Sequence, residues 1–118
     1  MKTVTLCGGM RFAREMQAIA LNLEVNHGMN VLQCTYNPEE MVLSEIQANA
    51  IVQAHYRKIE LSDGIYVVDI GGYIGQSAKQ EIAYAQSLGK EVLYHSQHSK
   101  LPRKPKLSRQ FRIIPGRN

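Results

Sequence analysis

Residues that could do chemistry gather in three segments of the chain. In the first, Gly8, Gly9 and Arg11 follow a short apolar run. Because glycine lacks a Cβ atom, a ligand can approach the backbone of such a loop, and the planar arginine guanidinium suits a phosphate or a carboxylate. A tight turn between a strand and a helix would need glycines too. The loop therefore has a ligand-binding and a purely structural explanation, and both stay open.

A second glycine-rich loop, residues 71–75, precedes a helix that contains Glu81. The spacing predicts a capping box over residues 77–80, with Ser77 as the cap and Glu81 one turn inside the helix. At that position Glu81 borders the inward-facing apolar stripe and should overhang a cleft. An acid near the start of a helix is ordinarily explained by the helix dipole, so this interpretation of Glu81 also stands.

The third group consists of polar side chains near the third apolar run. Asp69 ends this run, which places it at the expected ligand edge, whereas Asp63 is a turn residue before it. His55 lies eight residues before Asp63; imidazole can donate a proton near neutral pH, although a lone helical histidine is usually structural. His95 and His98 are spaced like metal ligands but have no third partner, so no metal site is expected.

The elements that must position these residues alternate between β-branched runs and helical periodicity. This alternation predicts an α/β fold, a small doubly wound sheet of Rossmann-like or flavodoxin-like type with four to five parallel strands and flanking helices. Ligands of such folds bind beyond the carboxyl ends of the strands. Strands are expected over residues 3–7, 30–36, 65–70 and 91–94, and helices over about 12–26, 37–61 and 77–88.

The second helix is expected to be the longest. Asn37 supplies a cap, Pro38 the first turn and Glu40 the reciprocal capping residue, and the helical spacing continues to Leu61. The residues that this spacing predicts to face inward are Met41, Val42, Ile46, Ala50 and Ile59.

Composition excludes several classes of protein. With 118 residues, 44% of them hydrophobic and 20% charged, the chain has the make-up of one globular domain, and not of a disordered chain, a collagen or a coiled coil. There is no apolar stretch of about 18 residues and no signal-peptide core, so neither a membrane nor export is expected. The two cysteines have no metal-site or redox-motif spacing, which indicates reduced thiols in a cytoplasmic protein.

The net charge of +4 comes from the C-terminus. Residues 96–118 hold seven Lys and Arg and no acid, whereas residues 1–95 hold seven Lys and Arg and ten acids. The chain thus divides into a domain over residues 1–95 and a basic tail over residues 96–118, in which an apolar patch at 111–114 could add an edge strand. We expect the tail to be a solvated terminus, and nucleic-acid binding through it is the alternative.

Residues 3–95 resemble the nucleoside 2-deoxyribosyltransferase-like family, which includes nucleotide N-glycoside hydrolases. The resemblance rests on CGGMRF at residues 7–12, HYRKIELSDGIYVVD at 55–69 and GGYIGQSAKQEIAYAQSLGKEVLY at 71–94. Its strongest element is EIAYAQSLGKEV at residues 81–92, which is similar to the family pattern E-x-G-Y-A-x-x-x-G-K-x-V.

The resemblance implies roles for individual residues. Glu81 would be the nucleophile that attacks C1′ of the sugar, and His55 stands where family members commonly carry an aspartate that protonates the leaving base. Gly75 takes the place of a polar residue that contacts the sugar or its 5′ substituent. The first loop is similar to C-G-S-I-R of the nucleotide hydrolases, with Gly9 in place of serine; the retained Arg11 favours a phosphate-bearing nucleotide.

The resemblance also implies an activity. We expect cleavage of an N-glycosidic bond, or deoxyribosyl transfer, on a nucleoside or nucleoside 5′-monophosphate, with no cofactor. A homodimer or larger homo-oligomer is expected as well, since long helices leave apolar surface that a small sheet does not cover. A non-catalytic nucleotide-binding module on the same fold is the alternative. The expected substrate-binding residues are Gly8, Gly9, Arg11, Asp69, Gly75 and Ser77.

Overall fold

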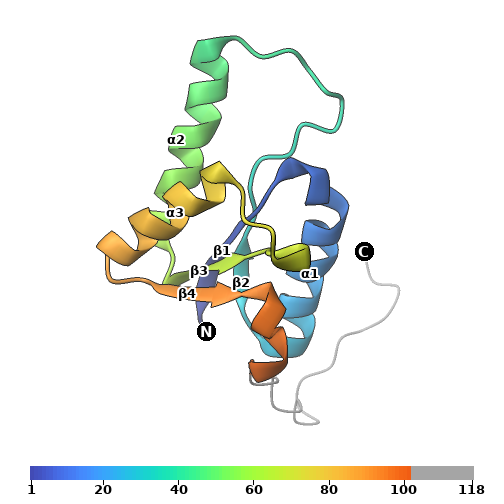
Figure 1. The fold of residues 1–118 in the computed structure, drawn as a ribbon, viewed down its shortest axis with the longest axis vertical. Coiled ribbons are helices and arrows are strands. Elements are labelled where there is room, and N and C mark those ends of the chain that lie inside the picture. The colour runs from blue at the N-terminus through green and yellow to red at the C-terminus, as the bar shows by residue number, and fades with distance from the viewer. Residues whose placement is uncertain (102–118) are drawn as a thin grey trace, which may run out of the picture.

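A computed structural model describes residues 1–101 of the chain, which form a four-stranded, all-parallel sheet with helices on both faces (Figure 1). The predicted small doubly wound α/β fold is thereby confirmed. The expected edge strand at 111–114 and most of the basic tail lie outside these residues. The strands are β1 (Thr3–Cys7), β2 (Asn30–Leu32), β3 (Gly64–Val67) and β4 (Glu91–Tyr94), and the α-helices are α1 (Ala13–His27), α2 (Glu45–Leu61) and α3 (Gln76–Ser87).

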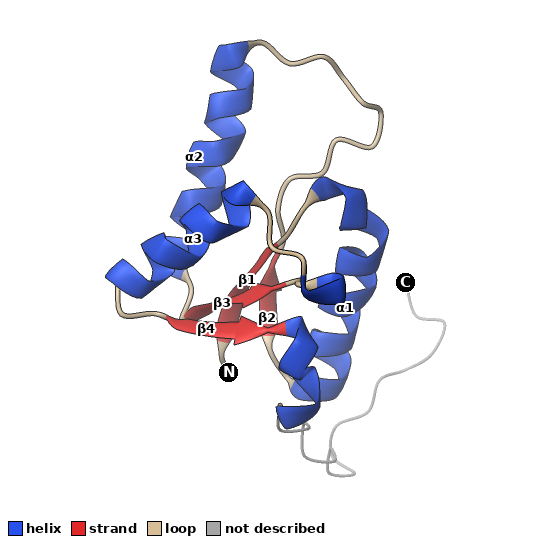
Figure 2. Ribbon diagram, viewed as in Figure 1, coloured by secondary structure: helices blue, strands red, loops and turns tan. Residues whose placement is uncertain are grey.

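The two faces of the sheet have different helical cover, as Figure 2 shows: α1 packs on one face, and α2 and α3 pack on the other. Successive side chains of a strand point to opposite faces, so β1 contributes to both layers. Val4 and Leu6 belong to the core beneath α1, while Cys7 packs with Ile59 of α2 and Ala85 of α3. Cys7 thus ends its strand directly beneath the two helices that carry the predicted site residues.

The strand order β2-β1-β3-β4 places a topological switch point between β1 and β3, because the chain leaves β1 toward β2 and later returns to the other side. In doubly wound folds the crevice at the carboxyl ends of such strands is the usual ligand site. Both glycine-rich loops follow these two strands. No helix within residues 1–101 combines the length and the apolar character needed to cross a bilayer.

The second helix begins later than predicted. Asn37 does not cap it; its side chain instead accepts a hydrogen bond from the Met41 N–H and donates one to the Met41 carbonyl, closing a local turn. The helix starts at Glu45, where Ser44 and Gln47 form a capping box. A short polar side chain that binds the nearby backbone competes with helix formation, which explains why Asn37 opens a turn.

This later start changes the environment of the side chains that were predicted to face inward. Ile59 is buried, but Ala50 is exposed, and Met41, Val42 and Ile46 are 60%, 98% and 84% exposed. The prediction was wrong for these four because the loop and the first turns of α2 extend beyond the edge of the sheet (Figure 1).

Three further boundaries differ from the prediction. The helix α3 begins at Gln76 with Gly75 as its N-cap and no side-chain cap, so Ser77 lies in the first turn and the predicted capping box is absent. The strand β2 ends at Leu32 because it is an edge strand that pairs only with residues 3–5 of β1. Similarly, β3 ends at Val67, where its pairing with β1 and β4 stops.

Gly64 allows the close approach of β3 and β4. A Cβ atom at this position would lie 2.6 Å from the carbonyl oxygen of Glu91, so Gly64→Ala is expected to destabilise the fold by about 1–3 kcal/mol. Gly9→Ala is the matched control, because a Cβ at Gly9 meets its nearest atom at 4.0 Å. Urea denaturation should give a lower midpoint for the first variant only; equal midpoints would contradict the close approach.

Candidate active site

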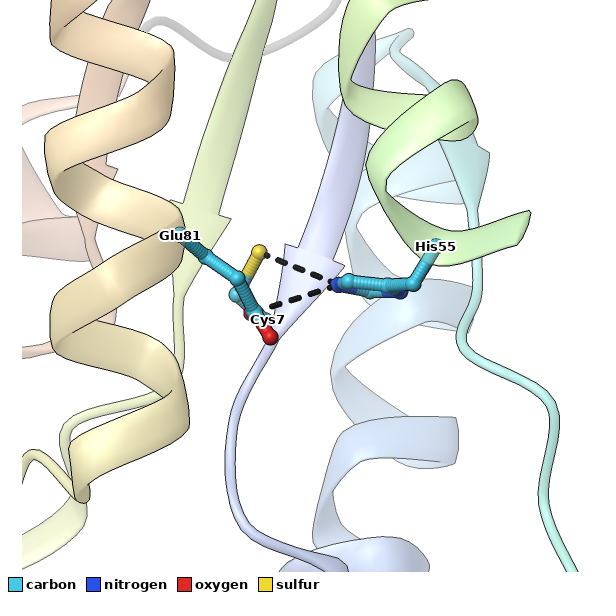
Figure 3. Close-up of side chains that lie close together, drawn as sticks. All are labelled: Cys7, His55 and Glu81. Carbon is cyan, nitrogen blue, oxygen red and sulfur yellow. Dashed lines mark hydrogen bonds and ion pairs between the residues drawn. The ribbon is translucent and has the colours of Figure 1, made fainter. Parts of the chain in front are cut away.

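Three side chains from three elements meet at the switch point (Figure 3). Cys7 ends β1, His55 lies on α2 and Glu81 lies on α3. The Cys7 Sγ atom is 3.5 Å from His55 Nε2, and the same nitrogen is 3.3 Å from Glu81 Oε1. One imidazole nitrogen therefore contacts both a thiol and a carboxylate.

The site is nearly closed to solvent. Cys7 is fully buried, and the side chains of His55 and Glu81 are only 11% and 14% exposed. Burial, reinforced by the neighbouring Glu81 carboxylate, raises the pKa of the Cys7 thiol well above its ordinary value, so the thiol is protonated at neutral pH. His55 Nδ1 is buried without a hydrogen-bond partner among residues 1–101. A buried polar atom of this kind is costly, which makes it typical of a functional position.

The position of Glu81 within α3 bears on its dipole interpretation. Glu81 is the sixth residue of the helix, and the first turn contains no acid. The helix dipole loses its influence within the first turn, so it accounts poorly for Glu81. The structure instead gives this carboxylate a nearly buried contact with His55 and an interaction with the Cys7 thiol.

A cavity of about 460 Å³ opens beside Glu81 and His55. This volume lies in the range of small-molecule sites. The loop after β1 and the first turns of α3 supply polar groups to its wall. The opposite wall is apolar and comes from α2 and the loop before it, with Leu43, Ala48, Ile51 and Val52.

Five of the eight predicted site residues line this cavity: Gly8, Gly9, His55, Ser77 and Glu81. The other three, Arg11, Asp69 and Gly75, do not. The guanidinium of Arg11 instead lies over the Tyr73 ring, 4.0 Å from its centre. Gly75 is the N-cap of α3 and faces the Tyr73 hydroxyl.

Asp69 was predicted to bind substrate, and it does not line the cavity. It follows β3 as expected, but its two carboxylate oxygens accept hydrogen bonds from the backbone N–H and the hydroxyl of Ser96, at 2.8 and 2.7 Å. These bonds hold the short 3₁₀ helix His95–Lys100 against the end of the sheet. Asp69 is therefore a buried structural carboxylate and not part of the cavity wall.

The two glycines of the first loop have different explanations. A Cβ atom at Gly8 would lie 3.1 Å from Val68 Cβ and 3.2 Å from Met16 Sδ, so tight packing already favours glycine there. At Gly9 there is room for a side chain, and its backbone angles are ordinary. The absence of a side chain at Gly9 thus leaves space in the cavity, which favours the ligand-binding explanation for this residue.

Two parts of the site were not predicted from the sequence. In the sequence, Cys7 looks like an ordinary core residue at the end of a strand. The only signal was the period of two along the strand, which puts Cys7 on the same face as Thr5 and opposite Leu6. The apolar wall was not predicted, although Ala48, Ile51 and His55 recur at helical spacing. Ala48, Ile51 and His55 line the cavity, whereas the buried residues of α2 are His55 and Ile59, in the second half of the helix.

No protein-family model and no curated protein matches this chain. The chemistry of the site is therefore inferred from its own geometry. A near-buried carboxylate held by an imidazole, at the wall of a small-molecule cavity, can serve as a nucleophile with an adjacent proton donor.

Proposed function

We propose that the protein breaks the N-glycosidic bond of nucleosides or nucleoside 5′-monophosphates, with Glu81 as the nucleophile. The observation that carries this proposal is the contact between Glu81 and His55 at the wall of a cavity of about 460 Å³. The family resemblance of residues 3–95 assigns the nucleophile to the same glutamate. The position of Glu81 in the cavity wall is compatible with the role that the resemblance implies.

The reaction proceeds through an oxocarbenium-like transition state. The Glu81 carboxylate attacks C1′ of the sugar, and the C1′–N bond breaks with its electron pair passing to the base. A proton from His55 neutralises the departing base. Water or the nitrogen of a second base then attacks C1′, gives up a proton to His55 and displaces the Glu81 carboxylate, which gives hydrolysis or transfer respectively.

The 3.3 Å contact between His55 and Glu81 adds a requirement to this mechanism. In retaining glycosidases the nucleophile and the acid flank the bond at about 5–5.5 Å, which leaves room for the sugar. Substrate must therefore separate the pair, so that Glu81 faces C1′ and His55 faces the base. Before substrate binds, the imidazole orients the carboxylate.

The cavity walls support a nucleoside-sized ligand. The apolar wall with Leu43, Ile51 and Val52 suits a planar base. Ser77 lies on the opposite side, in the first turn of a helix that starts without a side-chain cap. Free backbone N–H groups at such a helix start favour an anionic group, which supports a 5′-phosphate on the substrate.

A homo-oligomer forms part of this proposal. Met41, Val42 and Ile46 are exposed apolar side chains close together in sequence, where α2 and its preceding loop extend from the body (Figure 1). Large apolar side chains exposed in this way are available for contact with a second copy of the chain.

Base release tests the proposed reaction. The full chain is incubated with deoxynucleosides and their 5′-monophosphates in the presence of a chelator, and free base is separated by chromatography. Release of a base from at least one substrate is expected. A protein that is stabilised thermally by nucleotides but releases no base from any of them would contradict the proposal and favour the non-catalytic binding module.

A further inference from the structure

The cluster of Cys7, His55 and Glu81 presents sulfur, nitrogen and oxygen atoms to one point, all within 4.8 Å of one another. Thiolate, imidazole and carboxylate are the three side-chain groups that bind zinc in proteins. Hard cations such as Mg²⁺ and Ca²⁺ prefer oxygen ligands, so this mixture favours zinc over them.

The distances within the cluster match those of a tetrahedral zinc site. With a Zn–S bond of about 2.3 Å and Zn–N and Zn–O bonds of about 2.0–2.1 Å, tetrahedral angles hold sulfur and nitrogen about 3.5 Å apart and nitrogen and oxygen about 3.3 Å apart. Cys7 Sγ and His55 Nε2 are 3.5 Å apart, and His55 Nε2 and Glu81 Oε1 are 3.3 Å apart. Two of the three ligand-to-ligand distances thus already match, and the third, between Cys7 Sγ and a Glu81 carboxylate oxygen, is no longer than 4.8 Å.

We propose that Cys7, His55 and Glu81 form a three-ligand site for Zn²⁺ that inhibits the protein reversibly. The metal enters from the cavity that His55 and Glu81 line, and its fourth position remains open toward that cavity. On binding, the Cys7 thiol loses its proton to solvent and a Zn–S bond forms. The charge of the metal offsets the two anions, thiolate and carboxylate, that the buried site then holds together.

Reversibility follows from the surroundings of His55. A ligating histidine usually donates its other ring N–H to an acceptor, and loss of such a partner costs 10- to 100-fold in metal affinity. In the described part of the chain, His55 Nδ1 has no partner. The site therefore lacks the support of a permanent structural zinc site, and a chelator is expected to empty it.

This inference goes beyond the proposed reaction: zinc binding does not depend on that reaction, whereas inhibition by zinc rests on it. The consequence for that reaction is direct, since Zn²⁺ would hold the nucleophile and the proton donor together. The metal and the sugar compete for the Glu81 carboxylate, so the protein cannot bind zinc and react with substrate at the same time.

Titration of the full chain, freed of metal, with zinc chloride by calorimetry tests the site. One equivalent should bind, and Cys7→Ser should weaken binding by about 100-fold or more, since a lost ligand costs at least as much as a lost supporting contact. Cys34→Ser is the matched thiol control, and His98→Ala is the control for the surface pair of His95 and His98, whose rings stack 5.1 Å apart. Both controls should bind zinc like the unmodified chain.

Cobalt provides a second readout. Co²⁺ bound in place of zinc should give a thiolate-to-metal charge-transfer band that disappears in Cys7→Ser and persists in Cys34→Ser. If Cys7→Ser does not fold, Glu81→Gln is titrated instead and should also bind at least tenfold more weakly. Full-strength binding in these variants, or loss of binding in a control, would overturn the proposal. Because the titration measures metal and not turnover, its failure leaves the proposed reaction standing, and an absence of base release leaves the zinc site standing.

Discussion

Glu81→Gln is expected to reduce base release by at least about 1,000-fold while nucleotide binding stays within about tenfold. Glutamine has nearly the same shape as glutamate but cannot form the glycosyl ester. A group that acts in the transition state affects turnover far more than binding of the ground state. Single-turnover base release and calorimetric nucleotide binding, both with chelator present, measure the two quantities separately.

Glu15→Gln is the matched control for Glu81→Gln. Glu15 lies exposed in the first turn of α1, where the helix dipole favours an acid, and it is remote from the cavity wall. Its loss should cost about 0.3–1 kcal/mol of stability and leave base release unchanged. A Glu81→Gln variant that keeps full activity and loses only this much stability would make Glu81 a structural residue.

His55→Ala is expected to lower the rate of base release by about 100- to 10,000-fold, the usual range for a general acid. The loss should be largest for substrates whose base leaves poorly, because those depend most on protonation of the departing nitrogen. Measuring kcat over a series of bases of graded leaving ability gives this dependence, which should be steeper in the variant than in the unmodified protein.

The slope of that series separates two roles of His55. If the imidazole only orients Glu81, through the contact seen at 3.3 Å, the rate should fall by the same factor for every base. An equal loss across the series would therefore contradict the proton-donor role. His98→Ala is the control, because His98 is exposed and lies beyond β4, outside the cavity wall.

The fold could be predicted from local patterns. The β-branched run at Thr3–Cys7 and the run at Glu91–Tyr94 form strands with the predicted bounds, and the inward face of α1 contains Met16, Ile19 and Leu23 as its spacing indicates. Such patterns indicate which side chains of a segment are buried. A strand whose side chains are buried on both faces is typical of a parallel sheet. Boundaries set by competing local hydrogen bonds were less predictable, as the turn at Asn37 and the later helix start at Ser44 demonstrate.

The candidate site was predictable only in part. The two glycines of the first loop were predicted because loops at the carboxyl ends of parallel strands share one edge of the sheet. Glu81 was predicted because its helix follows such a loop, and His55 from its imidazole chemistry and the family resemblance. Asp69 also lies at this edge of the sheet, but its carboxylate accepts hydrogen bonds from Ser96. Ser96 lies beyond β4, and no local sequence pattern connects it to Asp69. The position of Asp69 was predictable, and its partner was not.

By itself the sequence determined the order of the elements, the parallel sheet and the edge at which a ligand would bind, because these follow from periodicity and from glycine and polar residues at strand ends. Only the tertiary structure decided that Cys7 and Glu81 meet at one nitrogen of His55. These residues lie on three elements, β1, α2 and α3, and their contact depends on how both helices pack across the same face of the sheet. Contacts between residues distant in sequence depend on how the elements pack, and local sequence patterns do not predict this packing.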